Sequence, residues 1–152
     1  MSNYKFSVSK LINASPKIVY SIIADYRDTH PKILPKPPFV SIDVEQGGFG
    51  AGTVATVQMK VMGKIQTFRT EVSEPEPGRV LVETNDTGYI TTFTVDSHNN
   101  GKNSFVTFTT EISNKSGLLK KLEFRLSKLL LIPVYQKELE NLERDANCLL
   151  SI

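Results

Sequence analysis

The final third of the sequence, from Ser116 to Leu150, has the pattern of one long amphipathic helix. Apolar residues recur there at steps of three and four, which places them on one side of a helix. These residues are Leu122, Leu126, Leu129, Leu139, Leu142, Ala146 and Leu149. A helix of about 34 residues is on the order of 50 Å long. So long an element constrains the fold, because the rest of the chain must cover its apolar side.

The part before this helix alternates apolar and polar residues as β-strands do. A first strand is predicted at 4–12, and a short helix follows, with Ser15 as its N-cap and Pro16 at its first position. A second helical turn or loop comes next, because four prolines between residues 31 and 38 exclude a long regular element. About six antiparallel strands follow from Val40, joined by turns such as Met62-Gly63.

An antiparallel sheet with one apolar face needs a cover on that face, and the long helix is available. We therefore predict an α+β fold. A curved antiparallel sheet of about seven strands wraps around the C-terminal helix, and two short helices follow strand 1. A hydrophobic cavity is expected between sheet and helix, within one domain over residues 1–152. Pro133 predicts a kink or break near Ile132.

Composition excludes several classes of protein. Lys and Arg outnumber Asp and Glu by 18 to 16, a net charge of +2 that does not indicate a nucleic-acid binder. No segment has as many consecutive apolar residues as a membrane-spanning helix needs. The N-terminus lacks a secretion signal, so we expect the cytoplasm. The single cysteine, Cys148, has no partner for a disulfide and is expected to be a buried or half-buried apolar residue.

Several short motifs, taken in order, are similar to the START-related helix-grip superfamily (SRPBCC). They are 14–20, Asp25-Tyr26, Leu34-Pro35, 50–53, 76–81, 92–95 and 105–109. This superfamily includes polyketide cyclases and dehydrases, birch-pollen-type allergens and lipid-transfer domains. The resemblance implies a deep hydrophobic cavity between sheet and terminal helix. It does not imply one chemistry, because members range from enzymes to passive binders.

Familiar catalytic and cofactor motifs are missing from the sequence. The glycines of 47–52 do not have the spacing of a dinucleotide loop, and a bulged strand connection explains them. His30 and His98 lie in unrelated segments, and neither belongs to a metal-ligand set or a hydrolytic triad. We expect no cofactor and no metal.

Polar residues on the apolar face are then the candidates for pocket chemistry. Tyr89 and Thr91 alternate in phase with Phe93, so their hydroxyls would point inward and orient a ligand, unless they only satisfy local groups. Tyr26 and His30 would gate the cavity or act as an acid/base pair. The alternative for His30 is an exposed loop histidine. Alternation predicts that Arg69 and Glu71 point to solvent.

No catalytic residue is assigned, and Tyr89, His30 and Tyr26 are the weak candidates. The expected ligand-binding residues are Tyr26, His30, Met59, Phe68, Tyr89, Thr91, Phe93, Phe108, Leu122, Leu126 and Leu130.

Three functions stay open. The first is binding or carriage of a small hydrophobic ligand, such as a lipid, isoprenoid, quinone or polyketide-like aromatic. The second is a metal-free enzyme of the cyclase or dehydratase type, in which polar pocket residues transfer protons. The third is a membrane-surface or interaction module that uses the basic half of the helix, at 115–128. Packing of that half against the sheet is the competing interpretation. A monomer or weak homodimer is expected.

Overall fold

The structure is a computed structural model that describes residues 4–113 and 117–150. Its elements, in chain order, are β1 (Lys5–Ile12), α1 (Pro16–Ala24), α2 (Thr29–Ile33), β2 (Phe39–Gln46), β3 (Val54–Val61), β4 (Lys64–Glu76), β5 (Val80–Asn85), β6 (Tyr89–His98), β7 (Asn103–Ile112) and α3 (Gly117–Leu150). The predicted α+β architecture, with seven strands and a long C-terminal helix, is therefore confirmed. Lys115, Ser116 and the side chain of Lys120, which belong to the predicted basic half-helix, lie outside the described residues.

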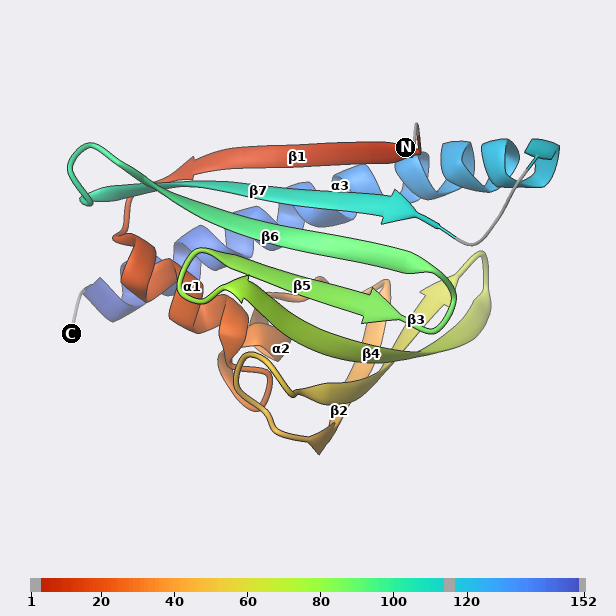
Figure 1. Cartoon of the computed structure of the whole chain (residues 1–152), viewed down its shortest axis with the longest axis horizontal. Coiled ribbons are helices and arrows are strands. Elements are labelled where there is room, and N and C mark those ends of the chain that lie inside the picture. The colour runs from red at the N-terminus through yellow and green to blue at the C-terminus, as the bar shows by residue number, and fades with distance from the viewer. Residues whose placement is uncertain (1–3, 114–116, 151–152) are drawn as a thin grey trace.

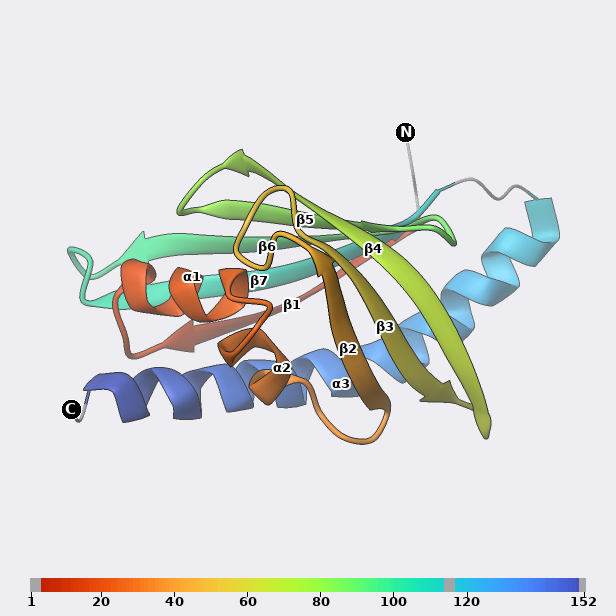
Figure 2. The same ribbon diagram turned by 90° about the horizontal axis from the view of Figure 1, so that it is seen from below.

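The seven strands form one antiparallel sheet in the order β1-β7-β6-β5-β4-β3-β2 (Figure 1). Strands β1 and β2 follow one another in the chain but occupy opposite edges of this sheet. The connection between them, which contains α1 and α2, must therefore pass from one edge to the other. It does so on the side of the sheet where α3 lies, and β2 to β4 curve around that side (Figure 2). This topology places α1 and α2 on the concave side of the sheet, beside α3.

Local sequence signals explain where the elements start and turn. Ser15 caps α1, because its Oγ accepts a hydrogen bond from the backbone N–H of Ile18 at 3.4 Å, and Pro16 takes the first helical position as predicted. The turn between β3 and β4 consists of Met62 and Gly63, whose φ angles of 52° and 82° are both positive. A two-residue hairpin turn of this kind matches the twist of the strands that it joins.

The glycine-rich segment between β2 and β3 makes close backbone contacts rather than a phosphate loop. The register of β2 shifts between Val44 and Gln46, just before these glycines. A Cβ atom at Gly50 would lie 2.2 Å from Oε1 of Glu74, and the φ of Gly50 is +62°. The same carboxylate accepts hydrogen bonds from the Tyr20 hydroxyl at 2.6 Å and from the Ala51 N–H at 2.7 Å. Glycine is therefore required where the loop meets β4. Strand β4 itself continues to Glu76.

Strand alternation predicts the inward face of β6 and β7 correctly. Phe93 and Val95 of β6 and Val106 and Phe108 of β7 are all buried in one core. On β4 the opposite phase is exposed, with Arg69 paired to carboxylates of Glu45 and Glu71.

Helix α3 runs without a break through Pro133, and Figure 2 shows its axis changing direction in its middle part. The expected bend is present and the alternative of a break is wrong. The C-terminal half packs as predicted, with Leu139, Leu142 and Ala146 buried.

The prediction that one apolar stripe runs the whole length of α3 is wrong. Leu122, Leu126 and Leu129 are exposed, as is Leu149 near the helix end. Leu126 and Leu142 are sixteen residues apart, which is about 4.4 helical turns, so they point to different sides of the helix. The N-terminal half instead turns Phe124, Ser127 and Leu131 inward.

Two smaller observations complete the description of α3. Cys148 is exposed, contrary to the expectation of a buried or half-buried residue, because it lies on the outer side of the last turns. Among the described residues, no helix is long and apolar enough to cross a membrane.

A hydrogen bond between α2 and α3 yields a test of this packing. The Asn141 side chain donates from Nδ2 to the buried carbonyl of Ile33 at 3.0 Å. Asn141→Ala leaves that carbonyl without its partner, so we expect the free energy of unfolding to fall by about 1–3 kcal/mol. Gln136→Ala, at an exposed position of the same helix, should change it by less than about 0.5 kcal/mol. Urea unfolding measures both, and equal effects would contradict the role of this bond.

Candidate functional site

Four side chains from separate parts of the chain form a polar cluster on the concave side of the sheet. Tyr26 and His30 come from the segment between α1 and α2 and from α2, Glu83 comes from β5, and Glu138 comes from α3. Tyr26, His30 and Glu138 are buried, with exposed fractions of 1%, 2% and 2%, and Glu83 is half-buried. Ionisable side chains are costly to bury, so such a cluster within an apolar core is a candidate site.

The backbone of α1 fixes the orientation of the His30 ring. Its Nδ1 lies 2.6 Å from the carbonyl oxygen of Ile23, and a carbonyl can only accept, so Nδ1 carries a proton. In the neutral imidazole, Nε2 is therefore the acceptor. Nε2 lies 3.9 Å from Oε2 of Glu83 and 3.9 Å from Oε1 of Glu138. Both separations exceed a direct hydrogen bond, so one small polar group could bridge the three side chains.

Aromatic rings hold the imidazole on two sides. The Tyr26 ring stacks on it at a centroid distance of 4.4 Å, and the Phe93 ring meets it edge-on at 5.9 Å. The Tyr26 hydroxyl donates to Oε2 of Glu83 at 2.5 Å. Ring packing and this bond leave little freedom to either Tyr26 or His30.

Burial changes the acid–base properties of the cluster. Burial, and secondly the nearby Glu83 carboxylate, raise the pKa of Glu138 well above its ordinary value. Burial and the same Glu83 carboxylate also raise the pKa of the Tyr26 hydroxyl. The raised pKa favours the protonated form of Glu138. The cluster thus combines a carboxylic acid that can donate a proton with an imidazole nitrogen that can accept one.

A second set of polar groups lies deeper, between α3 and the sheet. The Tyr135 hydroxyl is 2.7 Å from Oγ1 of Thr110, which is 3.0 Å from Oγ1 of Thr91. Burial raises the pKa of Tyr135, although its bond to Thr110 opposes the shift. Thr91 points inward as predicted, and its hydroxyl is engaged by these neighbours.

Tyr89 is positioned apart from His30, at the N-terminal half of α3. Its hydroxyl donates to Oε2 of Glu123 at 2.9 Å and is 2.5 Å from Oγ of Ser127. Burial raises the pKa of Tyr89 to about 12. These contacts join β6 to the helix.

The other residues expected to bind a ligand fall into three groups. Phe93 and Phe108 are buried, 4.7 Å apart between ring centroids, and close to His30 and Tyr135. Met59 and Phe68 are half-buried on the inward face of β3 and β4. Leu122, Leu126 and Leu130 are exposed. The role of all these residues in ligand binding stays a prediction.

The positions of His30, Glu83 and Glu138 differ most from what the sequence led us to expect. The alternative of an exposed loop histidine is wrong, because His30 lies on α2 and is buried. Glu83 and Glu138 were not among the candidates. The signals for them were weak. Glu83 is two residues after the buried Leu81 and so shares its face of β5. Glu138 is three residues after Tyr135 on the inward side of α3. Within the described residues, no group of three or more His, Cys, Asp or Glu could hold a metal ion.

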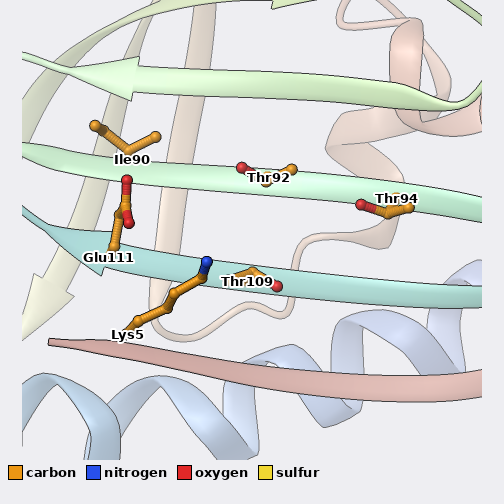
Figure 3. Close-up of a pocket in the computed structure, with 6 residues that line it drawn as sticks. All are labelled: Lys5, Ile90, Thr92, Thr94, Thr109 and Glu111. Carbon is orange, nitrogen blue, oxygen red and sulfur yellow. The ribbon is translucent and has the colours of Figure 1, made fainter. Parts of the chain in front are cut away.

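An open depression lies on the opposite, outer face of the sheet (Figure 3). Its lining residues are Lys5, Ile90, Thr92, Thr94, Thr109 and Glu111. Ile90, Thr92 and Thr94 alternate with the inward residues Thr91 and Phe93, so the depression is separated from the cluster by the sheet itself.

Solved structures share this arrangement over nearly the whole chain. The solution structure of the KanY protein is 27% identical, with a TM-score of 0.81, and the match covers 97% of this chain and 99% of that one. The Zhui aromatase/cyclase from Streptomyces sp. R1128 is 12% identical, with a TM-score of 0.72 and coverage of 94% and 93%. A START superfamily protein from Mycobacterium smegmatis is 14% identical, with a TM-score of 0.69 and coverage of 95% and 98%.

No curated protein matches the sequence. The family model described as polyketide cyclase/dehydrase and lipid transport matches residues 4–147. The chain therefore belongs to this family.

Proposed function

We propose that the chain binds a small, largely apolar molecule between the concave face of the sheet and α3. A hydroxyl or carbonyl oxygen of that molecule would meet His30, Glu83 and Glu138. The observation that carries this proposal is the position of the His30 ring, whose Nε2 lies 3.9 Å from a carboxyl oxygen of half-buried Glu83 and 3.9 Å from one of buried Glu138. A polar atom placed between them would give Nε2 of His30 and the two carboxyl groups a common hydrogen-bonding partner.

The packing of α3 supports room for a ligand. In the described part of the chain, α3 contacts β1, β7, α1 and α2, and no contact of comparable extent joins it to β2, β3, β4 or β5. Met59 and Phe68 point from those strands toward the helix and are only half-buried. Apolar side chains that are neither packed nor fully exposed suit the wall of a ligand site. The family description, which names lipid transport, agrees with an apolar ligand.

Native mass spectrometry tests the binding proposal. We expect gently purified protein to carry a non-covalent adduct that is absent from the denatured chain. Protein refolded without the adduct should gain thermal stability when a fatty acid, isoprenoid, quinone or polyketide-like aromatic is added, by about 2.7 kcal/mol at a hundredfold excess over its Kd. Absence of an adduct together with no thermal shift from any of these four classes would refute the proposal.

Proton transfer is the second candidate function. It is favoured because His30 offers a proton acceptor and Glu138 a proton donor. Nδ1 of His30 is fixed as a donor, so Nε2 is free to accept a proton, while the raised pKa of Glu138 favours its acid form. An acid and a base on either side of one oxygen or carbon could catalyse enolisation, cyclisation or loss of water. The similarity to a structure named as an aromatase/cyclase agrees with this chemistry.

The amide of asparagine separates the two roles of His30. In His30→Asn, Nδ2 can still donate to the Ile23 carbonyl, but the acceptor at Nε2 is gone. In D2O, we expect the native protein to exchange the hydrogens beside the carbonyl of a long-chain methyl ketone, and His30→Asn to do so about 10²–10⁴-fold more slowly. Deuterium incorporation is read by mass spectrometry. Tyr89→Phe in the same assay decides whether Tyr89 shares the role, and exchange that is equal in native protein and His30→Asn would reject proton transfer by His30.

The pH dependence of stability tests the burial of Glu138. Because its pKa is raised from 4.5, the folded chain keeps a proton that the unfolded chain loses. The free energy of unfolding should therefore fall as pH rises from about 4.5 toward the raised value, by at most about 1.4 kcal/mol per pH unit. We expect Glu138→Gln to reduce this slope, measured by urea unfolding between about pH 5 and pH 8.

Glu140→Gln is the matched control for that measurement. Glu140 lies on the same helix, 61% exposed and paired with Lys137, so its removal should leave the slope unchanged. Glu83, His30 and Tyr26 face Glu138 from other elements and remain in both variants. Identical slopes in Glu138→Gln and Glu140→Gln would contradict a buried, protonated Glu138.

A further inference from the structure

Four leucines on the N-terminal half of α3 face solvent, and we call Leu122, Leu126, Leu129 and Leu130 the leucine stripe. Their exposed fractions are 58%, 44%, 73% and 45%. Positions 122, 126 and 129 follow steps of four and three, so they lie on one side of the helix. Clustered exposed leucines are unusual on a soluble surface and mark an interaction site.

The inward side of the same turns is already occupied. Phe124 meets the rings of Tyr4 and Phe6 at 5.4 Å and 6.2 Å. Glu123 and Ser127 contact the Tyr89 hydroxyl. Because these contacts fix the rotation of the helix, the leucine stripe cannot turn toward the core without breaking them.

Positive charge accompanies the leucine stripe. Lys121, Arg125 and Lys128 are exposed on the same turns. The one acidic residue between 121 and 133 is Glu123, which is half-buried and accepts from Tyr89. This part of the helix therefore presents leucines beside cations, and its acidic group faces the sheet.

The position of these turns makes them accessible to a flat surface. The first turns of α3 project beyond the end of β7, away from the body of the sheet (Figure 1). A planar partner could therefore approach the stripe from outside.

We propose that the leucine stripe docks on the surface of an anionic lipid bilayer. The leucines would enter the boundary between headgroups and acyl chains, while Lys121, Arg125 and Lys128 would meet lipid phosphates. A second copy of the chain fits the same surface less well, because a twofold contact brings two sets of three cations together. The proposal does not rest on the chemistry of His30 or on the identity of an internal ligand.

Flotation with lipid vesicles tests the docking. We expect the 152-residue chain to float with vesicles of phosphatidylcholine mixed with phosphatidylglycerol at low salt, and binding to weaken as salt is added. Vesicles of phosphatidylcholine alone should bind far less. The triple variant Lys121→Glu, Arg125→Glu and Lys128→Glu should lose on the order of 100-fold in affinity for the anionic vesicles.

Two further variants separate surface docking from a general charge effect. Leu122→Gln, Leu126→Gln and Leu129→Gln together should abolish flotation and keep the circular dichroism spectrum, because these side chains lie outside the core. Lys17→Glu, Lys36→Glu and Lys102→Glu carry the same change in net charge at exposed positions outside α3, and should bind as the native protein does.

The outcomes that would overturn the proposal are specific. No flotation at low salt, equal binding to neutral vesicles, or equal losses in the α3 and control charge variants would each refute it. A dimer in light scattering that the leucine variant abolishes, without vesicle binding, would assign the stripe to a second copy instead.

Discussion

The attachment of α3 to one side of a curved sheet is the constraint on which the other features depend. Aromatic rings make this attachment: Phe6 of β1 stacks near Tyr135 of α3, and Tyr135 meets Phe108 edge-on. Aromatic pairs of this kind add to the area that they bury and fix the relative angle of their elements. Because α3 is held by β1 and β7, the strands from β2 to β4 can curve around the side of the sheet on which it lies (Figure 2). Side chains, and not backbone packing, then determine the shape of the interior between α3 and these strands.

The buried cluster lies where three independent elements converge in that interior. Helix α2 and the link before it supply two rings, β5 supplies a half-buried carboxylate, and α3 supplies a carboxyl that is almost wholly buried. A hydrophobic residue at position 138 would avoid the cost of burying an acid, and stability alone therefore does not explain Glu138. Proteins tolerate such costs mainly where a perturbed acid has a task.

Much of the fold was readable because alternation in strands is a strong signal. Phe93, Val95, Val106 and Phe108 were assigned to the correct face, and the Met62-Gly63 turn fixed the register of β3 and β4. The site was harder to foresee. Strand β5 begins with three apolar residues in succession, so alternation does not say whether Leu81 or its neighbours point inward, and Glu83 was missed with them.

Helix α3 shows the other limit of reading a periodicity. Steps of three and four residues define a side of a helix only over a few turns, and the apolar residues before and after Pro133 belong to different sides. A charged residue on a helix is usually exposed, so Glu138 gave no reason to be placed inside. The burial of His30 depends on a crossing from one sheet edge to the other, which no local pattern reveals.

The bulges in β2 have a consequence for how copies of this protein meet. Strand β2 forms an edge of the sheet, where unpaired backbone groups can recruit a foreign strand. Register shifts near both of its ends and the acidic residues Asp43 and Glu45 make that edge uneven and negatively charged. Self-association by extending the sheet is thereby disfavoured at β2. The hydrogen-bonding edge is protected against aggregation, even though the molecule keeps an exposed apolar helix elsewhere.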